Sequence, residues 1–161
     1  MKINKQDEYG LRILLRIARS DSEMGLSIPQ LSELEGMSKP YVGKITRLLR
    51  LAGFVESTRG QKGGYVLAQD PKDIIIKDVI SSLGGNLFNK DFCGQHSGEI
   101  RICTNSVDCS IRSLWTILQY TVDKVLANIS LIDLMGNEGD SKNKLDQIIA
   151  DKIDVMELTG F

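Results

Sequence analysis

Apolar side chains recur at helical spacing three times within the first 53 residues, and each recurrence predicts a short helix. The first pattern covers residues 7–19, with apolar positions at Leu11, Leu14, Leu15 and Ala18. The second begins after Ser27, which matches a capping box with Gln30 three residues later, and it ends at Gly36. Its predicted inner face consists of Leu31 and Leu34.

The third pattern begins at Ser38, has Pro40 in its first turn and ends at Gly53. Its apolar positions are Tyr41, Val42, Ile45, Leu48 and Leu49. Two short predicted strands, 54–57 and 65–67, follow on either side of a glycine-rich basic turn and together predict a hairpin. Three helices and a hairpin in this order predict a winged helix-turn-helix, in a fold that is mainly α with a small β-wing.

The second half of the chain begins after Pro71, where residues 74–83 predict a short strand entering a helix that ends at Gly84 and Gly85. A loop over 86–107 is long for a compact domain, and such loops are usually functional. Residues 108–134 then predict one long helix. Its apolar residues alternate in steps of four and three at Ile111, Trp115, Leu118, Val122, Val125, Ile129 and Ile132.

This heptad seam favours a partner helix, and therefore a homodimer; packing within its own chain is the alternative. A polar segment over 136–144 precedes a second candidate helix over 145–158 with Ile148, Ile149, Ile153 and Met156 inward. We therefore divide the chain into a winged helix-turn-helix domain (1–70), a connector with a cysteine-rich loop (71–107), a long dimerisation helix (108–135) and a C-terminal tail (136–161).

Composition narrows the class of protein. With 42% hydrophobic residues the chain can form a core, no apolar run suits a bilayer, and the N-terminus lacks a signal peptide's apolar stretch, so we expect a cytoplasmic protein. Residues 1–68 carry 11 Lys and Arg against 7 Asp and Glu, whereas residues 69–161 carry 9 against 14. A basic N-terminal part on an acidic body suits a DNA-contact surface, although chance clustering is the alternative.

The third helix and the hairpin carry the candidates for contacts with double-stranded DNA. A helix in the major groove usually meets base edges with its N-terminal residues. The candidates on the helix are Ser38, Lys39, Pro40, Tyr41, Lys44 and Arg47, with Arg50 better placed for phosphate. Those on the wing are Arg59, Lys62, Gly63 and Gly64. An arginine at a wing tip suits a narrow minor groove, and the glycines permit a close approach to phosphate.

Three segments resemble those of the IscR/NsrR group of bacterial winged-helix transcription regulators: YVGKITRLL (41–49), RGQKGGY (59–65) and NISL (128–131). The resemblance covers about residues 1–135. It implies a homodimer on a partly palindromic operator. It also implies that the cysteine loop and the long helix hold an iron–sulfur cluster whose state sets the affinity for DNA.

Cys93, Cys103 and Cys109 lie between the DNA-reading and dimerising segments. Cytoplasmic thiols stay reduced, so metal ligands or reactive groups are favoured over disulfides. The spacing lacks the close pairs of structural zinc sites. In the resembling family the second and third cysteines are also five residues apart, whereas the first gap is longer here and 98–100 resembles an insertion. We expect an iron–sulfur cluster, 2Fe-2S rather than 4Fe-4S; zinc and a metal-free thiol sensor are the alternatives.

The candidates for a fourth ligand of the cluster are His96, in the loop, and Asp7 or Glu8, on the first helix. In NsrR-like members an acidic residue at the start of the first helix reaches the cluster from the partner subunit, and alignment through Leu11 and Arg12 places it on Glu8. The alternative for Glu8 is a solvated carboxylate at a helix start, stabilised by the helix dipole. For His96, an exposed loop histidine is the favoured interpretation.

The sequence therefore predicts a transcription regulator controlled by redox state, nitric oxide or cluster status. A cluster-free thiol regulator is the first alternative, and an iron–sulfur carrier or redox protein is the second. An enzyme is not expected, because the chain has no nucleotide-binding glycine pattern, no histidine-assisted nucleophile and no paired catalytic carboxylates.

Overall fold

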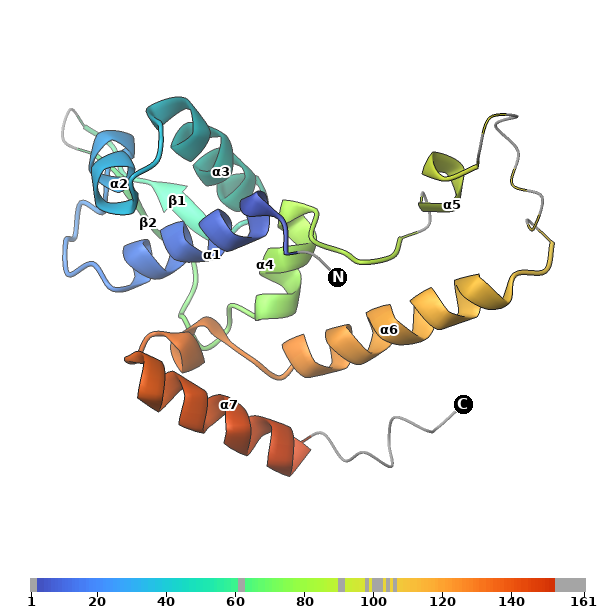
Figure 1. The fold of residues 1–161 in the computed structure, drawn as a ribbon. Helices are drawn as coiled ribbons and strands as arrows, with labels where there is room; N and C mark the ends of the chain where they lie inside the picture. Colours follow the sequence, from blue (N-terminus) through green and yellow to red (C-terminus); the bar gives the residue numbers. More distant parts are fainter. Residues whose placement is uncertain are drawn as a thin grey trace.

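A computed structural model describes residues 3–60, 63–89, 92–97, 99, 103, 105 and 107–152. Its elements are α1 (Lys5–Ala18), α2 (Ile28–Glu35), α3 (Lys39–Leu51), β1 (Val55–Ser57), β2 (Tyr65–Leu67), α4 (Ile76–Leu83), α5 (Phe92–Gln95), α6 (Ser110–Leu126), the 3-10 helix η1 (Leu131–Leu134) and α7 (Glu138–Lys152). Helices α1 to α4 gather around the hairpin, and α6 runs outward from this body (Figure 1). The predicted winged helix-turn-helix, mainly α with a small β-wing, is confirmed. No helix in the described segments is long and apolar enough to cross a membrane.

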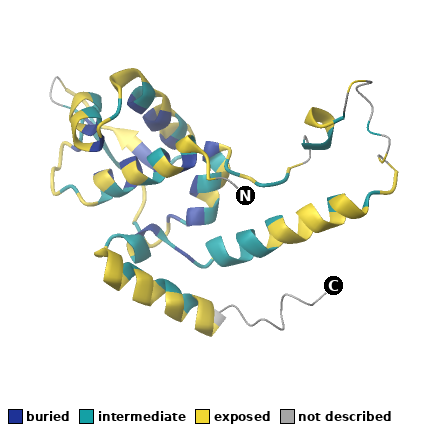
Figure 2. Cartoon of the chain, in the orientation of Figure 1, coloured by how far each residue is buried: buried dark blue, intermediate teal, exposed yellow. Residues whose placement is uncertain are grey.

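The core lies between α1, α3 and α4 (Figure 2). The inner face of α3, Val42, Ile45 and Leu49, is fully buried as its spacing predicts. On α1 the helical spacing predicts the helix correctly, but the most deeply buried side of the helix lies beside the four apolar positions. Its buried residues include Gly10, Ile13, Leu14 and Ile17, whereas Leu11, Leu15 and Ala18 are only half-buried.

Gly10 explains the different orientation of α1. A Cβ there would lie 2.3 Å from Cδ1 of Leu83 on α4, so the missing side chain lets the two helices approach closely. This contact turns the Gly10 side of α1 toward the core. A pattern of apolar residues cannot reveal that preference, because the residue that decides it has no side chain.

Helix α2 also buries a different side chain from the one predicted. Leu31 is fully buried, but Leu34 is 50% exposed, and Glu35 at the helix end is buried instead. Arg12 Nε donates to Glu35 Oε2 at 2.9 Å, and Arg16 Nε donates to Glu35 Oε1 at 2.7 Å. A buried carboxylate needs such partners, and this paired charge fixes α2 against α1.

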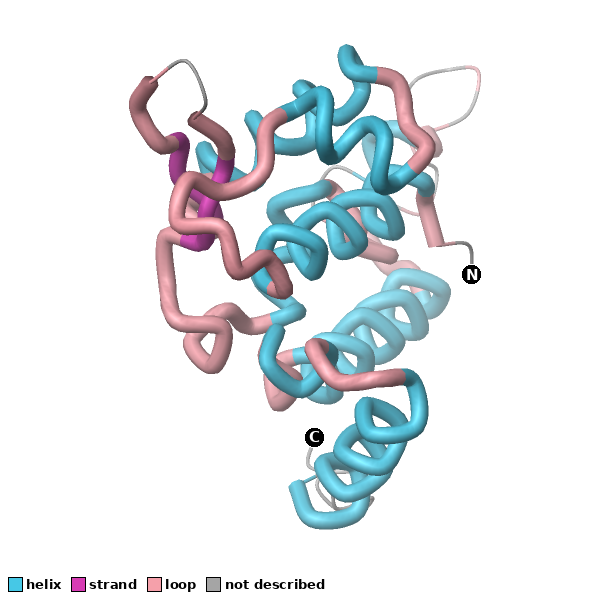
Figure 3. The backbone as a smooth tube through the Cα atoms, turned by 90° about the vertical axis from the view of Figure 1, so that its left-hand side faces the viewer, coloured by secondary structure: helices cyan, strands magenta, loops and turns pink. Residues whose placement is uncertain are grey.

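The wing is an antiparallel pair in which Val55 faces Leu67 and Ser57 faces Tyr65. Leu26, in the loop before α2, adds an isolated bridge on the other side of Tyr65. Its N–H donates to Tyr65 O at 3.1 Å, and Tyr65 N–H donates to Leu26 O at 2.9 Å. Figure 3 shows the two strands at one side of the helices. The sequence gives no periodic signal for Leu26, because a single bridge has no alternation.

The predicted long helix ends earlier than expected. Helix α6 stops at Leu126, and the chain then pairs with the segment before α4: Ile76 N–H donates to Ile129 O, and Leu131 N–H donates to Ile74 O, both at 2.9 Å. Ile129 is buried in the winged-helix core and Ile132 lies on η1, so neither continues a seam on α6. The predicted strand near residue 74 is reduced to this one bridge.

The last helix begins earlier than predicted, because α7 starts at Glu138 within the segment predicted as polar and non-helical. Arg19 at the end of α1 holds the turn before it, donating to the carbonyl oxygens of Leu134, Met135 and Gly136 at 2.7–3.0 Å. The predicted inward residues Ile153 and Met156 lie outside the described residues.

Candidate functional site

Helix α3 presents a basic face opposite its buried one. Lys39, Lys44, Arg47 and Arg50 are all exposed, and α3 carries no acidic residue. Ser38 occupies the N-cap position with extended backbone, and Pro40 lies in the first turn, as predicted. This face has the shape and charge of a helix that enters a DNA groove.

Tyr41 is a predicted DNA-contact residue whose ring packs against α1. Its ring packs edge-to-face against Tyr9, with centroids 5.7 Å apart and an interplanar angle of 87°. The side chain is half-buried, so it presents only part of its surface at the start of α3.

The wing tip places Arg59 in solvent, next to Gly60 with φ of +114°. Gly63 and Gly64 have reasons inside the fold: added Cβ atoms would lie 2.4 Å from Thr58 O and 2.5 Å from the Leu26 carbonyl carbon. Gly64 is buried, which favours a role in wing shape rather than a direct phosphate contact. Lys62 lies outside the described residues.

Thr58 is a site residue that sequence reasoning did not single out. Its hydroxyl donates to Met24 O at 2.8 Å and accepts from the Gly64 N–H at 2.8 Å. These bonds join the wing base to the loop before α2, directly beside Arg59. A threonine before a glycine-rich turn is the only available signal, and it is a weak one.

The three cysteines occupy different parts of the connector. Cys93 lies on α5, Cys103 follows in the segment toward α6, and Cys109 is the N-cap residue of α6. All three are free thiols and half-buried. As a donor set they fit an iron–sulfur cluster in chemistry, since thiolates are its usual ligands. Within the described residues, no three Cys, His, Asp or Glu side chains come together as a metal site.

His96 is held by α5 itself. Its ring stacks on Phe92 with centroids 4.1 Å apart, and Nδ1 lies 2.8 Å from Phe92 O. In the neutral imidazole, Nδ1–H donates to this carbonyl. The proton is then on Nδ1, and the lone pair of Nε2 can bind a metal ion. Histidine ligands of metals often have such a carbonyl bond on the other nitrogen, so His96 stays a candidate ligand.

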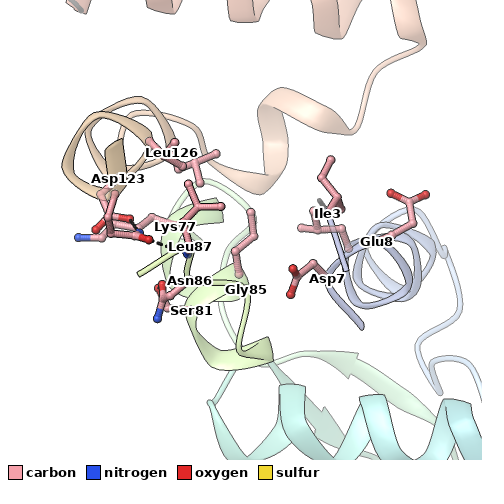
Figure 4. Close-up of a pocket in the computed structure, with 14 residues that line it drawn as sticks. Ile3, Asp7, Glu8, Lys77, Ser81, Gly85, Asn86, Leu87, Asp123 and Leu126 are labelled. Atoms are coloured by element: carbon pink, nitrogen blue, oxygen red, sulfur yellow. Dashed lines mark hydrogen bonds between the residues drawn. The ribbon is translucent and has the colours of Figure 1, made fainter. Parts of the chain in front are cut away.

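Asp7 and Glu8 face different surroundings. Glu8 is exposed in the first turn of α1, and its carboxylate points away from Asp7 (Figure 4). Asp7 is 6% exposed, and its Oδ1 has no hydrogen-bond partner among the residues that the structure describes. Burial raises the pKa of the Asp7 carboxyl, and hydrogen bonds with Asn4 oppose this by a smaller amount. Of the two acids, Glu8 is the one accessible to another subunit.

Helix α6 has no buried residue, and one end of it is strongly apolar. Its exposed large side chains are Ile111, Leu114, Trp115, Ile117, Leu118 and Tyr120, each 39–61% exposed. Three of them belong to the predicted seam. At the other end, Val125 and Leu126 pack against the core of the winged helix. The apolar half of α6 is therefore presented away from this body.

Comparison with known proteins agrees with this architecture. The Rrf2 family profile, described as an iron-dependent transcriptional regulator, matches residues 3–137. Protein rrf2 of Nitratidesulfovibrio vulgaris is 33% identical over 135 residues, covering 84% of this chain and 87% of its own length.

Two solved structures are similar at 30% identity and a TM-score of 0.64. They are IscR of T. potens, which covers 84% of this chain and 86% of its own, and the global cysteine regulator CymR of Bacillus subtilis, which covers 84% and 96%. These relatives are regulators and not enzymes. With three helices, a wing and a basic α3 in place, the chain belongs to the Rrf2 family of DNA-binding transcription regulators.

Proposed function

We propose that this regulator is a homodimer whose affinity for a partly palindromic operator depends on an iron–sulfur cluster. The main observation in support is that the three cysteines are all free thiols and all lie in the segment that joins the DNA-reading body to α6. The family description as iron-dependent and the similarity to IscR support a cluster.

Cys93, Cys103 and Cys109 would hold the cluster, of 2Fe-2S type in our assignment. The exposed Glu8 of the partner subunit would supply the fourth ligand, with His96 as the second candidate. A carboxylate oxygen is a weaker ligand for iron than a thiolate and is more readily displaced. When bound, the cluster supplies a centre that reacts with oxidants or nitric oxide.

Two of the proposed ligands, Cys109 and Glu8, lie at the start of helices that connect the cluster to the DNA-binding surface. Cys109 is the N-cap of α6, so ligation there constrains where that helix begins. Glu8 lies on α1, which packs against α3. Ligation by both would fix one subunit's α6 relative to the other subunit's α3, and thereby the spacing of the two recognition helices.

Homodimerisation through α6 is supported by its exposed apolar end. Ile111, Trp115 and Leu118 repeat at steps of four and three and are 61%, 39% and 41% exposed. A second copy of this helix would bury them, which is the usual reason for a heptad seam on an outward-facing helix.

The DNA contacts follow from the exposed basic groups. We assign base-edge contacts to Ser38, Lys39, Pro40 and Tyr41, further groove contacts to Lys44 and Arg47, and a minor-groove contact to Arg59. We assign Arg50 to phosphate. Lys62 and Gly63 would contact the backbone at the wing, and Gly64 would shape it.

The proposal is tested by an absorption spectrum of anaerobically purified protein, with iron and sulfide counted per chain. We expect visible absorption and near-equal iron and sulfide in the wild type, and their loss in Cys103→Ala. Ser97→Ala removes a polar hydroxyl group in the same segment. It is the matched control and should keep both the visible absorption and the iron and sulfide.

A colourless wild-type protein would contradict the cluster assignment. If the affinity of that protein for DNA nevertheless changed with oxidant, and Cys103→Ala abolished the change, the free thiols would be the sensor. The observation that favours this second function is that Cys93, Cys103 and Cys109 are all free thiols and only half-buried.

A further inference from the structure

A cavity of about 250 Å³ lies between α1, α4 and α6 (Figure 4), and its lining includes no cysteine and no residue of α3. Its walls are mostly apolar: Ile3, Leu11, Ile80, Leu87, Val122 and Leu126. It is somewhat smaller than the pockets of drug-sized ligands, about 300–1,000 Å³, so an occupant must be small.

The Asp7 carboxyl lies in the wall of this cavity. Asp7 is 94% buried, and its Oδ1 has no hydrogen-bond partner within the described residues. Gly85 makes room for the carboxyl, because a Cβ at Gly85 would lie 2.5 Å from Asp7 Oδ2. A buried polar atom without a partner is costly and rare in native proteins, so it calls for a partner that the chain itself does not provide.

The other polar groups of the wall restrict which partner fits. Gln119 is already engaged: its Oε1 accepts from the N–H groups of Leu87 and Phe88, and its Nε2 donates to Asp123 Oδ1 at 2.7 Å. Without the outward-pointing Glu8, the charged residues of the wall are the acids Asp7 and Asp123 and the base Lys77, so the charge balance favours a cation. Lys77 is half-buried on α4, across the cavity from α1.

We propose that this cavity binds a small organic ammonium compound with a short apolar body, whose ammonium group donates to Asp7. The apolar body would pack between Ile80 and Leu87 on one side and Val122 and Leu126 on the other. The ammonium group is shared by simple alkylamines and by apolar α-amino acids, whose carboxylate would face Lys77.

An occupant would connect the DNA-reading body to the dimerising helix. It would contact α1 and α4, both of which pack on α3, and at the same time the end of α6. The site would therefore serve an effector. Glu8, the proposed fourth ligand of a partner's cluster, also lines the cavity, but its carboxylate points away from Asp7 (Figure 4).

The test is calorimetric titration of the full-length protein at neutral pH with three probes that share one apolar tail. These are 3-methylbutan-1-amine, leucine and 3-methylbutanoate. We expect saturable binding of the amine and none of the carboxylate. If leucine also binds and Lys77→Gln weakens leucine but not the amine, the natural ligand is an amino acid; if leucine fails, it is a simple amine.

Asp7→Asn should weaken binding of the amine by roughly 10- to 100-fold, the usual contribution of a hydrogen bond to a charged group. Asp21→Asn removes the same charge at an exposed position and should leave binding unchanged. The free energy of unfolding of Asp7→Asn, measured alongside, shows whether lost binding reflects lost structure. No saturable binding of either ammonium probe, equal binding of the carboxylate, or unchanged affinity in folded Asp7→Asn would overturn the proposal.

Discussion

Asp7 and Glu8 are neighbours in sequence, yet one carboxyl is buried and the other exposed. Sequence reasoning identifies both as acids at a helix start and ranks them only by family resemblance. What separates them is Gly85, which lies against the Asp7 carboxyl but 78 positions away along the chain. Burial that depends on such a distant residue leaves no local signal.

The burial of Asp7 predicts a pH-dependent effect of Asp7→Asn. Because burial raises the pKa of Asp7, the folded state holds the proton more tightly than the unfolded state does. The contribution of Asp7 to the free energy of unfolding therefore falls as pH rises through the folded pKa. Asn does not titrate, so the variant should be more stable than wild type at pH 8, by about 1 kcal/mol.

Urea unfolding at pH 8 and pH 4.5 checks this expectation. The advantage of Asp7→Asn should shrink at the lower pH, where the wild-type carboxyl is protonated in a larger fraction of folded molecules. Asp21→Asn, at an exposed position, should show no such trend. An Asp7→Asn protein less stable than wild type at pH 8 would contradict our account of this carboxyl.

At the scale of elements, apolar periodicity and turn residues were sufficient to predict α1, α2, α3 and the wing. The same signals gave a wrong helix end where a residue fits the heptad spacing but belongs to another part of the fold. The position of Ile129 in the sequence continues the heptad spacing of α6, yet the residue lies beyond the end of the helix and packs in the winged-helix core. The paired backbone groups around Ile75 and Ser130 end the helix, and such a long-range bridge cannot be found by spacing alone.

The wing is an element whose position depends on Thr58. Thr58→Val removes the hydroxyl that joins Met24 to Gly64, and we expect DNA affinity to fall by about 1 kcal/mol, roughly fivefold. Thr58→Ser should retain most of the affinity. The measurement is fluorescence anisotropy with labelled operator at fixed salt.

A double-mutant cycle shows whether Thr58 acts through Arg59. Arg59→Ala alone should cost about 1–3 kcal/mol of binding. In that background Thr58→Val should cost clearly less than it does alone, because the contact that it positions is gone. Fully additive losses would indicate that Thr58 supports the fold generally and does not position Arg59.

Helix α6 carries a prediction about assembly. Leu118→Glu places a charge on its exposed apolar face and should convert the dimer to a monomer in sedimentation velocity experiments. Affinity for a two-half-site operator should then fall at least tenfold, because a monomer reaches one half-site. Ser113→Glu, exposed on α6 but outside the seam, should stay dimeric. A dimeric Leu118→Glu protein would show that the subunits associate elsewhere.

In the whole molecule, a basic reading surface and an outward apolar helix are joined by the segment that carries every cysteine (Figure 1). The sequence alone predicts this order. It does not predict the geometry of the cysteines, which in our proposal depends on a bound group and on a second subunit. Within the described residues of one chain, no three Cys, His, Asp or Glu side chains gather into a metal site, and the proposed ligand set takes its fourth member, Glu8, from a partner subunit.

The most direct test compares operator affinity of one anaerobic preparation before and after its cluster is removed by chelation under reducing conditions. Wild-type affinity should change at least tenfold, and reconstitution with iron and sulfide should restore the original value. Cys103→Ala should bind DNA as the cluster-free wild type does in every condition. Equal operator affinity of the wild type with and without the cluster would contradict the central claim.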